Sequence, residues 1–182
     1  MFSKRIVMIV ALILFLFSMG SAFCDPVASK SFNLKHVVNV AREYHFEFRN
    51  PDNNDVIDSV SLDSSGTHLI ATLAINYNTN ITFSRIAVSF TDLKKTDNDS
   101  LYYPYTMDIL RPNTSDRLVN TTSAENGHGA GAATLYENKT FRKYSTDAWN
   151  TDEVADFRIN LDDSEALAGT YQGNLQIEFA VV

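Results

Sequence analysis

Strict alternation of apolar and polar residues is the clearest pattern in this sequence, and it is strongest over residues 169–182. After Gly169, a large apolar side chain occupies every second position except one, which is Gly173. The apolar positions are Tyr171, Leu175, Ile177, Phe179 and Val181. Because successive side chains of a strand point to opposite faces, a period of two predicts a strand with one buried face.

Shorter alternating or apolar runs recur along the rest of the chain, separated by residues typical of turns. They predict strands near residues 31–41, 44–48, 56–62, 69–75, 81–90, 102–110, 133–137 and 154–161. Polar segments predict turns or loops at residues 50–55, 63–66, 76–80, 92–100 and 113–133. Long stretches with the 3.6-residue period of a helix do not occur. We therefore expect an all-β fold, an immunoglobulin-like β-sandwich.

The first apolar run differs from the predicted strands. Two basic residues precede an unbroken apolar stretch at residues 6–17, and small residues follow it. This order is typical of a secretory signal peptide, and the apolar stretch is shorter than the roughly 20 residues of a membrane-spanning helix. We predict that residues 1–24 are a signal peptide, that cleavage follows Ala22 or Cys24, and that the protein is exported.

Loss of this segment changes the charge and the cysteine count. The chain has 15 basic and 22 acidic residues; residues 1–24 hold two of the basic ones and no acidic one, which leaves 13 against 22, a net charge of −9. This charge argues against nucleic acid or an anionic membrane surface as a partner. Cleavage after Cys24 leaves a fold without cysteine, so a single core must supply the stability that disulfides often give small exported domains. We expect one sandwich domain at residues 42–182, preceded by an N-terminal extension at residues 25–41.

The residue patterns of known catalytic and metal sites are missing from the sequence. None of the histidines has a second histidine or a cysteine at metal-ligand spacing; they are His36, His45, His68 and His128. Residues 127–131 are rich in glycine but lack the lysine of a phosphate-binding loop. The acidic turns at 52–55 and 97–99 lack the rest of an EF-hand pattern. We predict a protein that is not an enzyme and that holds no cofactor or metal.

Aromatic residues are the remaining candidates for contact with a ligand. Trp149 and the cluster of Tyr102, Tyr103 and Tyr105 have rings that can stack on a sugar. Packing in the core or at a sheet edge is the simpler interpretation of all four.

Two alternating segments bracket the predicted domain. One is the last strand, and the other lies at residues 31–41, where the apolar positions are Phe32, Leu34, Val38 and Val40. An uncovered last strand would expose unpaired backbone groups at a sheet edge. The N-terminal segment can cover that edge by folding back within its own chain. Alternatively, the segment of a neighbouring subunit covers it, and such a head-to-tail contact builds a filament.

The last strand resembles that of bacterial chaperone–usher pilins. Residues 168–179 read Ala-Gly-Thr-Tyr-Gln-Gly-Asn-Leu-Gln-Ile-Glu-Phe. They are most similar to the colonisation-factor fimbriae of the alternate chaperone pathway, whose last strand begins with an Ala-Gly-Asn-Tyr-Ser-Gly type of sequence and whose major pilins also lack a disulfide. Residues 38–52 and 72–93 resemble the N-terminal pattern and the middle strands of that family. The chain differs from the family in having His36 among the apolar positions and Val181 in place of an aromatic residue.

The resemblance implies a structural subunit of a surface fimbria that contributes to adhesion. In this family a subunit lacks one strand, a periplasmic chaperone covers the resulting groove, and the N-terminal strand of the next subunit replaces the chaperone at an outer-membrane usher. The donor strand would contain Phe32, Leu34, Val38 and Val40. The acceptor groove would contain Gly169, Tyr171, Leu175, Ile177, Phe179 and Val181. The implied partners are other pilin subunits, the chaperone, the usher and a host receptor, and the protein would pass through the periplasm to the cell surface.

A second interpretation stays open. The chain is then a monomeric secreted immunoglobulin-like module that recognises a protein or a glycan, and its two bracketing segments are simply the first and last strands of a self-contained sandwich.

Overall fold

The computed structural model of the 182-residue chain describes residues 29–35, 44–119, 129–144, 146, 148–162 and 167–182. The predicted signal peptide lies outside these ranges, as do Val38 and Val40 of the predicted donor strand. All twelve elements in the described part are strands, and the prediction of an all-β fold is confirmed. Among these residues there is no helix that is long and apolar enough to cross a membrane.

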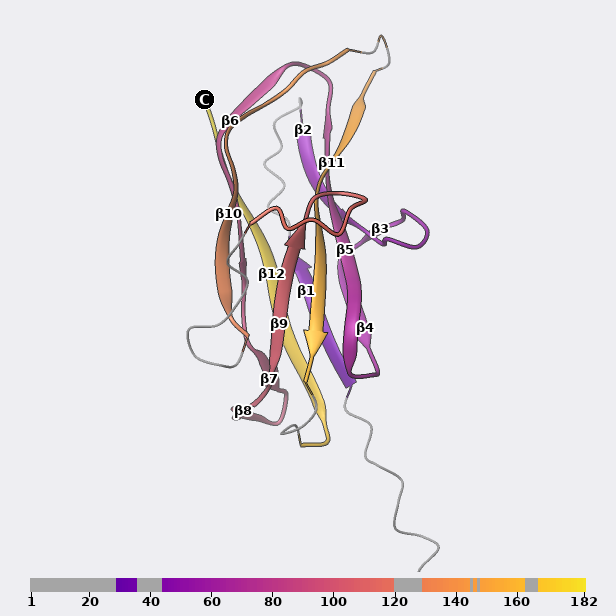
Figure 1. The fold of residues 1–182 in the computed structure, drawn as a ribbon, viewed down its shortest axis with the longest axis vertical. Helices are drawn as coiled ribbons and strands as arrows, with labels where there is room; N and C mark the ends of the chain where they lie inside the picture. The colour runs from indigo at the N-terminus through magenta and orange to yellow at the C-terminus, as the bar shows by residue number, and fades with distance from the viewer. Residues whose placement is uncertain (1–28, 36–43, 120–128, 145, 147, 163–166) are drawn as a thin grey trace, which may run out of the picture.

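The strands form two sheets that pack against each other as a β-sandwich (Figure 1). The seven-stranded sheet consists of β1 (Ser29–Lys35), β4 (Ser59–Leu62), β6 (Ile81–Phe90), β7 (Leu93–Lys95), β8 (Asn98–Tyr103), β10 (Gly131–Phe141) and β12 (Thr170–Val181). The five-stranded sheet consists of β2 (Tyr44–Arg49), β3 (Val56–Ile57), β5 (Gly66–Tyr77), β9 (Tyr105–Leu110) and β11 (Asn150–Leu161).

Strand order places the first and last strands next to each other. The seven-stranded sheet has the order β10-β6-β12-β1-β4, with β7 paired to β12 and β8 paired to β7. The five-stranded sheet has the order β3-β2-β5-β11-β9. Every pairing between these strands is antiparallel except that of β1 with β12, which is parallel.

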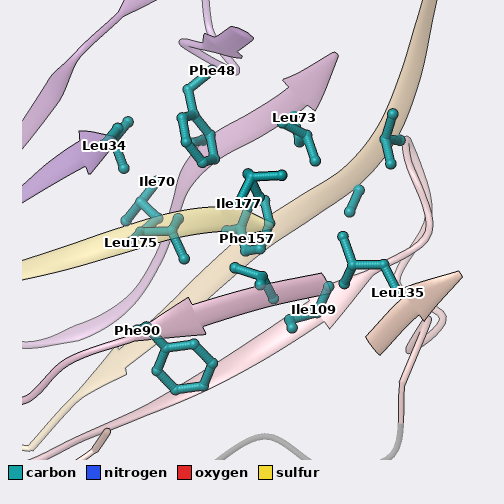
Figure 2. Packing of buried hydrophobic residues seen from close by; sticks show 14 of the residues in the cluster. Leu34, Phe48, Ile70, Leu73, Phe90, Ile109, Leu135, Phe157, Leu175 and Ile177 are labelled. Carbon is teal, nitrogen blue, oxygen red and sulfur yellow. The ribbon is translucent and has the colours of Figure 1, made fainter. Parts of the chain in front are cut away.

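The inward side chains of both sheets form one core. Leu34, Leu175 and Ile177 of the seven-stranded sheet gather with Ile70 and Phe157 of the other sheet, and all five are at most 3% exposed (Figure 2). Burying a side chain of this size stabilises the fold by about 1.5–3 kcal/mol. The alternation in the sequence puts Leu34, Leu175 and Ile177 on one face of their strands, so this side of the core follows from the pattern.

Two predicted strands are broken in the structure. The run at 56–62 divides at Asp58 into β3 and β4, which belong to different sheets. The run at 102–110 divides at Pro104 into β8 and β9, which also belong to different sheets. Proline has no N–H to donate to a ladder, so a strand that must continue in another sheet can change direction there.

Two predicted loops are partly wrong. The segment at 92–100 contains β7 and the start of β8, because Leu93 is fully buried and anchors a short hairpin. The end of the loop predicted at 113–133 is closely packed. Gly129 has a φ of 121° and lies against the ring of Tyr105, and a Cβ on Gly131 would lie 2.8 Å from the Cζ of Phe90. Residues 120–128 lie outside the described ranges.

Candidate functional site

The strand β1 lies between β12 and β4 of its own chain (Figure 1). It pairs with β12 in parallel over seven residue pairs and with β4 in antiparallel fashion over four. A further backbone bond runs from Leu34 N to Asp58 O, at 2.8 Å. In the described part of the chain, β4 pairs with no other strand. Removal of β1 would therefore expose one edge of β12 and leave β4 without a neighbour.

Two of the four predicted donor residues are buried beneath this strand. Phe32 is 0% exposed and Leu34 is 3% exposed, whereas Asn33 between them points to solvent. The ring of Phe32 meets that of Tyr105 edge to face, with centroids 5.5 Å apart. Leu34 lies opposite Leu175 in the ladder with β12. Aromatic contacts of this geometry add about 0.5–1.5 kcal/mol to the gain from burial.

A third buried residue of β1 was not among the predicted ones. Lys30 is 2% exposed, and its Nζ lies 4.8 Å from the centroid of the Tyr103 ring. Tyr103 in turn meets Tyr171 edge to face at 5.3 Å. A cation over an aromatic face is stabilised by the ring quadrupole. Lys30 has the parity of Phe32 and Leu34, so the alternation contained the signal, but a lysine is normally expected in solvent.

The predicted acceptor residues differ in burial along β12. Tyr171, Leu175 and Ile177 are fully buried, and Phe179 is half-buried against the rings of Phe46 and Phe83 on the two sheets, at 4.9 and 5.8 Å. Val181 is 46% exposed, so its predicted place on the buried face is wrong. The register of β12 on β6 shifts between Ala180 and Val181, where β6 has one extra residue, Ser84.

Gly169 begins this strand in a conformation that favours glycine. Its φ is 148°, and a Cβ there would overlap the side chain of Lys95. A larger residue would be strained by the backbone and would also displace Lys95. This glycine therefore fixes where the chain enters β12.

Only part of β12 has a partner on the β1 side. β1 pairs with residues 170–176, whereas β12 extends to Val181. On the opposite side, β6 pairs with Leu175 and the residues up to Val181. Within the described ranges, no strand pairs with the remaining edge of residues 177–181. This edge can accept a further length of strand.

The outer face of the five-stranded sheet carries a polar network. Glu47 accepts a hydrogen bond from Arg49 Nε at 2.6 Å, and Asn76 lies 3.0 Å from His45 Nε2. Burial alone would raise the pKa of Glu47, but hydrogen bonds from Asn76 and Arg49 and the charge of Arg49 outweigh it and lower that pKa below 4.5. The network holds the outer surface of β2 and β5 together.

A polar cleft of about 770 Å³ adjoins this network. It lies between the turn at 50–54 and the segment at 113–116, and Leu69 contributes to its lining. The buried Asp156 accepts hydrogen bonds there from Thr72 Oγ1 at 2.6 Å and from Asn113 N at 2.9 Å. Throughout the described ranges, no cluster of three or more His, Cys, Asp or Glu residues is arranged to hold a metal ion.

The aromatic residues do not form a shared platform for a sugar. Tyr103 and Tyr105 are core residues, at 0% and 3% exposure. The Tyr105 hydroxyl donates a 2.6 Å hydrogen bond to Thr91 O, and burial, followed by the charge of Asp92, raises its pKa. Trp149 is 43% exposed and pairs instead with His45, with ring centroids 5.6 Å apart.

Comparison with known proteins does not identify a family. The sequence matches no protein-family model, and a search of curated proteins finds no significant match. The arrangement of β1, β12 and β4 is therefore the feature from which a function can be argued.

Proposed function

We propose that the chain is an exported structural subunit of a surface fimbria, in which β1 of one copy completes the seven-stranded sheet of another. The observation that supports this proposal is the position of β1. It is an interior strand, hydrogen-bonded on both edges, yet it comes first among the strands and its neighbours β12 and β4 do not pair with each other.

The contacts that hold β1 do not depend on which copy supplies it. They consist of a backbone ladder and a few inward side chains, chiefly Phe32 and Leu34. The same segment of a second copy offers the same groups, so strand addition in trans can replace strand pairing in cis. Because donor and acceptor are different surfaces, the contact is head to tail and propagates as a fibre.

The carboxyl-terminal part of β12 adds a second reason. Among the described residues, none pairs with residues 177–181 on the side of β1. The sequence continues the alternating pattern at Val38 and Val40, beyond the described part of β1. A donor strand that extends this far can use more of β12 than the seven pairs that the described part of β1 forms.

The second candidate is a monomeric binding module. The pairing of β1 within its own chain favours it, because a sandwich that completes itself needs no partner. The polar cleft beside Asp156 is then the place for a protein or glycan ligand. Neither candidate assigns a catalytic role to any residue.

A disulfide that locks β1 in its own chain separates the two candidates. Asn33 and Asn174 are opposite each other in the parallel ladder, and both are exposed. Adjacent strands lie about 4.7–4.9 Å apart, which is within the Cα spacing that a disulfide accepts. The mature chain from residue 25 contains no other cysteine. The variant Asn33→Cys/Asn174→Cys therefore has one defined cross-link.

We expect the reduced variant to form fibres and the oxidised variant to stay monomeric. The chains are incubated in guanidinium below the unfolding midpoint to speed strand exchange, then examined by light scattering and electron microscopy, with Asn33→Cys alone as the control. Fibres that form equally well with the lock closed would refute exchange of β1. Chains that remain monomeric in every form would favour the binding module.

A further inference from the structure

Gly173 is the one inward position of β12 between Tyr171 and Ile177 that has no side chain, and the space above it is enclosed. A Cβ built there would lie 3.1 Å from Phe32 Cε1, 3.3 Å from Asp92 O and 3.3 Å from Leu93 Cδ2. We call this space the Gly173 recess. Phe32 is opposite Gly173 in the ladder, and its fully buried ring fills the recess.

The walls of the recess are held by a shared partner, Thr91. The backbone of Asn174, next to Gly173, exchanges two hydrogen bonds with this residue: Thr91 N donates to Asn174 O at 3.0 Å, and Asn174 N donates to Thr91 Oγ1 at 2.9 Å. The hydroxyl of Tyr105, whose ring contacts Phe32, donates to Thr91 O at 2.6 Å. These hydrogen bonds hold Asn174 and Tyr105 in place on either side of the recess, so the recess resists widening and collapse.

The neighbouring positions do not offer the same space. Lys30 is opposite Tyr171, and Leu34 is opposite Leu175, so both flanking positions of β12 carry large side chains. A strand shifted by two residues would bring an aromatic ring onto one of these side chains instead of into the recess. Between Phe23 and Tyr44, Phe32 is the only phenylalanine, tyrosine or tryptophan in the sequence.

We propose that Gly173 and Phe32 are a matched pair that selects the strand in this groove and sets its register. In the single chain the selected strand is β1. In the fibre it is the same segment of a second copy, and this part of the inference rests on the proposed function. The partner segment is thereby defined as one with a single aromatic residue at the position opposite Gly173.

A double-mutant cycle in the intact mature chain tests the pair. The variant Gly173→Val is made with Phe32 and with Phe32→Ala, and amide hydrogen exchange of β1 reports its opening. With Phe32 present, overpacking of about 1–3 kcal/mol raises the opening constant by roughly 5- to 150-fold. With Phe32→Ala, the nearest of the three close contacts is removed and valine can use the vacated space, so the change is several-fold smaller. Gln172→Val, on the exposed face of β12, is the matched control. Equal effects in both backgrounds would overturn the proposal.

Disulfide cross-linking of an introduced cysteine pair then shows the register of the bound strand and whether that strand belongs to the same chain or to a second copy. In the parallel arrangement, Asn33→Cys/Asn174→Cys cross-links within one chain. A second copy that enters in the same direction with Phe32 opposite Gly173 also places its Asn33 opposite Asn174, so the same cysteine pair then cross-links between chains, and non-reducing electrophoresis separates linked oligomers from the internally linked monomer. Addition of Gly173→Val should suppress either cross-link.

The possible results separate the matched pair from the proposed function. A cross-link within the chain that is sensitive to Gly173→Val, without any cross-link between chains, supports the pair and refutes the fibre. A cross-link between chains that is insensitive to Gly173→Val supports the fibre and refutes the pair.

Discussion

Truncation of Phe32 to alanine should cost the fold a large part of its stability. The side chain is 0% exposed, and its loss removes the edge-to-face contact with Tyr105. Phe→Ala in a core costs about 3–5 kcal/mol, and the cost is highest where the surroundings cannot close the cavity. Here Gly173 has no side chain to move in, and Thr91 restrains both walls. We therefore expect about 4–5 kcal/mol, or a fall in Tm of roughly 8–20 °C for a domain of this size.

Equilibrium unfolding of the mature chain in urea, followed by circular dichroism, measures this loss. Asn33→Ala is the control, because Asn33 is the exposed neighbour on the same strand and should change stability by no more than about 0.5 kcal/mol. If β1 can detach on its own, the loss is limited to the free energy with which β1 docks. A Phe32→Ala variant within about 1 kcal/mol of the wild type would show that β1 is not part of the cooperative fold.

Three further predictions concern other parts of the structure. Ile177→Asp should lower the free energy of unfolding by more than about 4 kcal/mol, whereas Val181→Asp should leave it within about 0.5 kcal/mol, and similar urea midpoints would contradict the burial assigned to β12. Gly129→Ala should cost at least about 2 kcal/mol, because the backbone has a positive φ and the added Cβ meets Tyr105; an unchanged Tm would refute that packing. The pKa of Glu47 is lowered in the fold, so the ionised carboxylate stabilises the wild type relative to Glu47→Gln. The difference in their free energies of unfolding should be complete above pH 4.5 and disappear as the pH falls through the lower pKa of the folded state. A difference that does not depend on pH would refute this.

Local alternation was enough to predict the strands and most of the core. The run at residues 169–182 places its apolar residues on one face, and the structure buries most of that face in β12. In the run at 81–90 the apolar parity changes between Phe83 and Ile86, and the structure buries both groups because the register of β6 shifts between them. The pattern failed where a tertiary contact decides. The short strand β7 forms because Leu93 has a place in the core, and Val181 is exposed although it continues the alternation of β12.

The sequence predicted most residues of the candidate site, but not which strands pair or which side chains contact one another. Alternation states which face of a strand is buried and says nothing of which edge it pairs with or in which direction. The parallel pairing of β1 with β12, the burial of Lys30 over Tyr103, and the fit of Phe32 on Gly173 all join residues from distant parts of the sequence. The sequence showed that Gly173 interrupts the large apolar positions of the last strand, but its role depends on Phe32, whose ring occupies the space beside it.

The balance between pairing in cis and in trans follows from the length of strand that each arrangement uses. A segment tethered by a short linker is present at an effective concentration in the millimolar range. Binding of the segment from a second copy at about 1 μM is less favourable by about 4 kcal/mol, since each tenfold difference in concentration corresponds to about 1.4 kcal/mol. Exchange therefore requires contacts that β1 does not make in its own chain. Such contacts can form at the edge of residues 177–181, which pairs with no described strand on the side of β1.

Val38 and Val40 are the residues to which the fibre hypothesis assigns these extra contacts. Burial of two valines supplies about 3–6 kcal/mol, and backbone hydrogen bonds add about 0.5–1.5 kcal/mol each, which together exceed the deficit of about 4 kcal/mol. We expect Val38→Asp/Val40→Asp to abolish fibres while the free energy of unfolding of the monomer stays within about 0.5 kcal/mol of the wild type. The matched control is Asn39→Asp, which adds charge on the opposite parity of the segment. If the double variant forms fibres at the wild-type rate, the longer strand is not what drives exchange, and the pairing of β1 within its own chain is the stable end state.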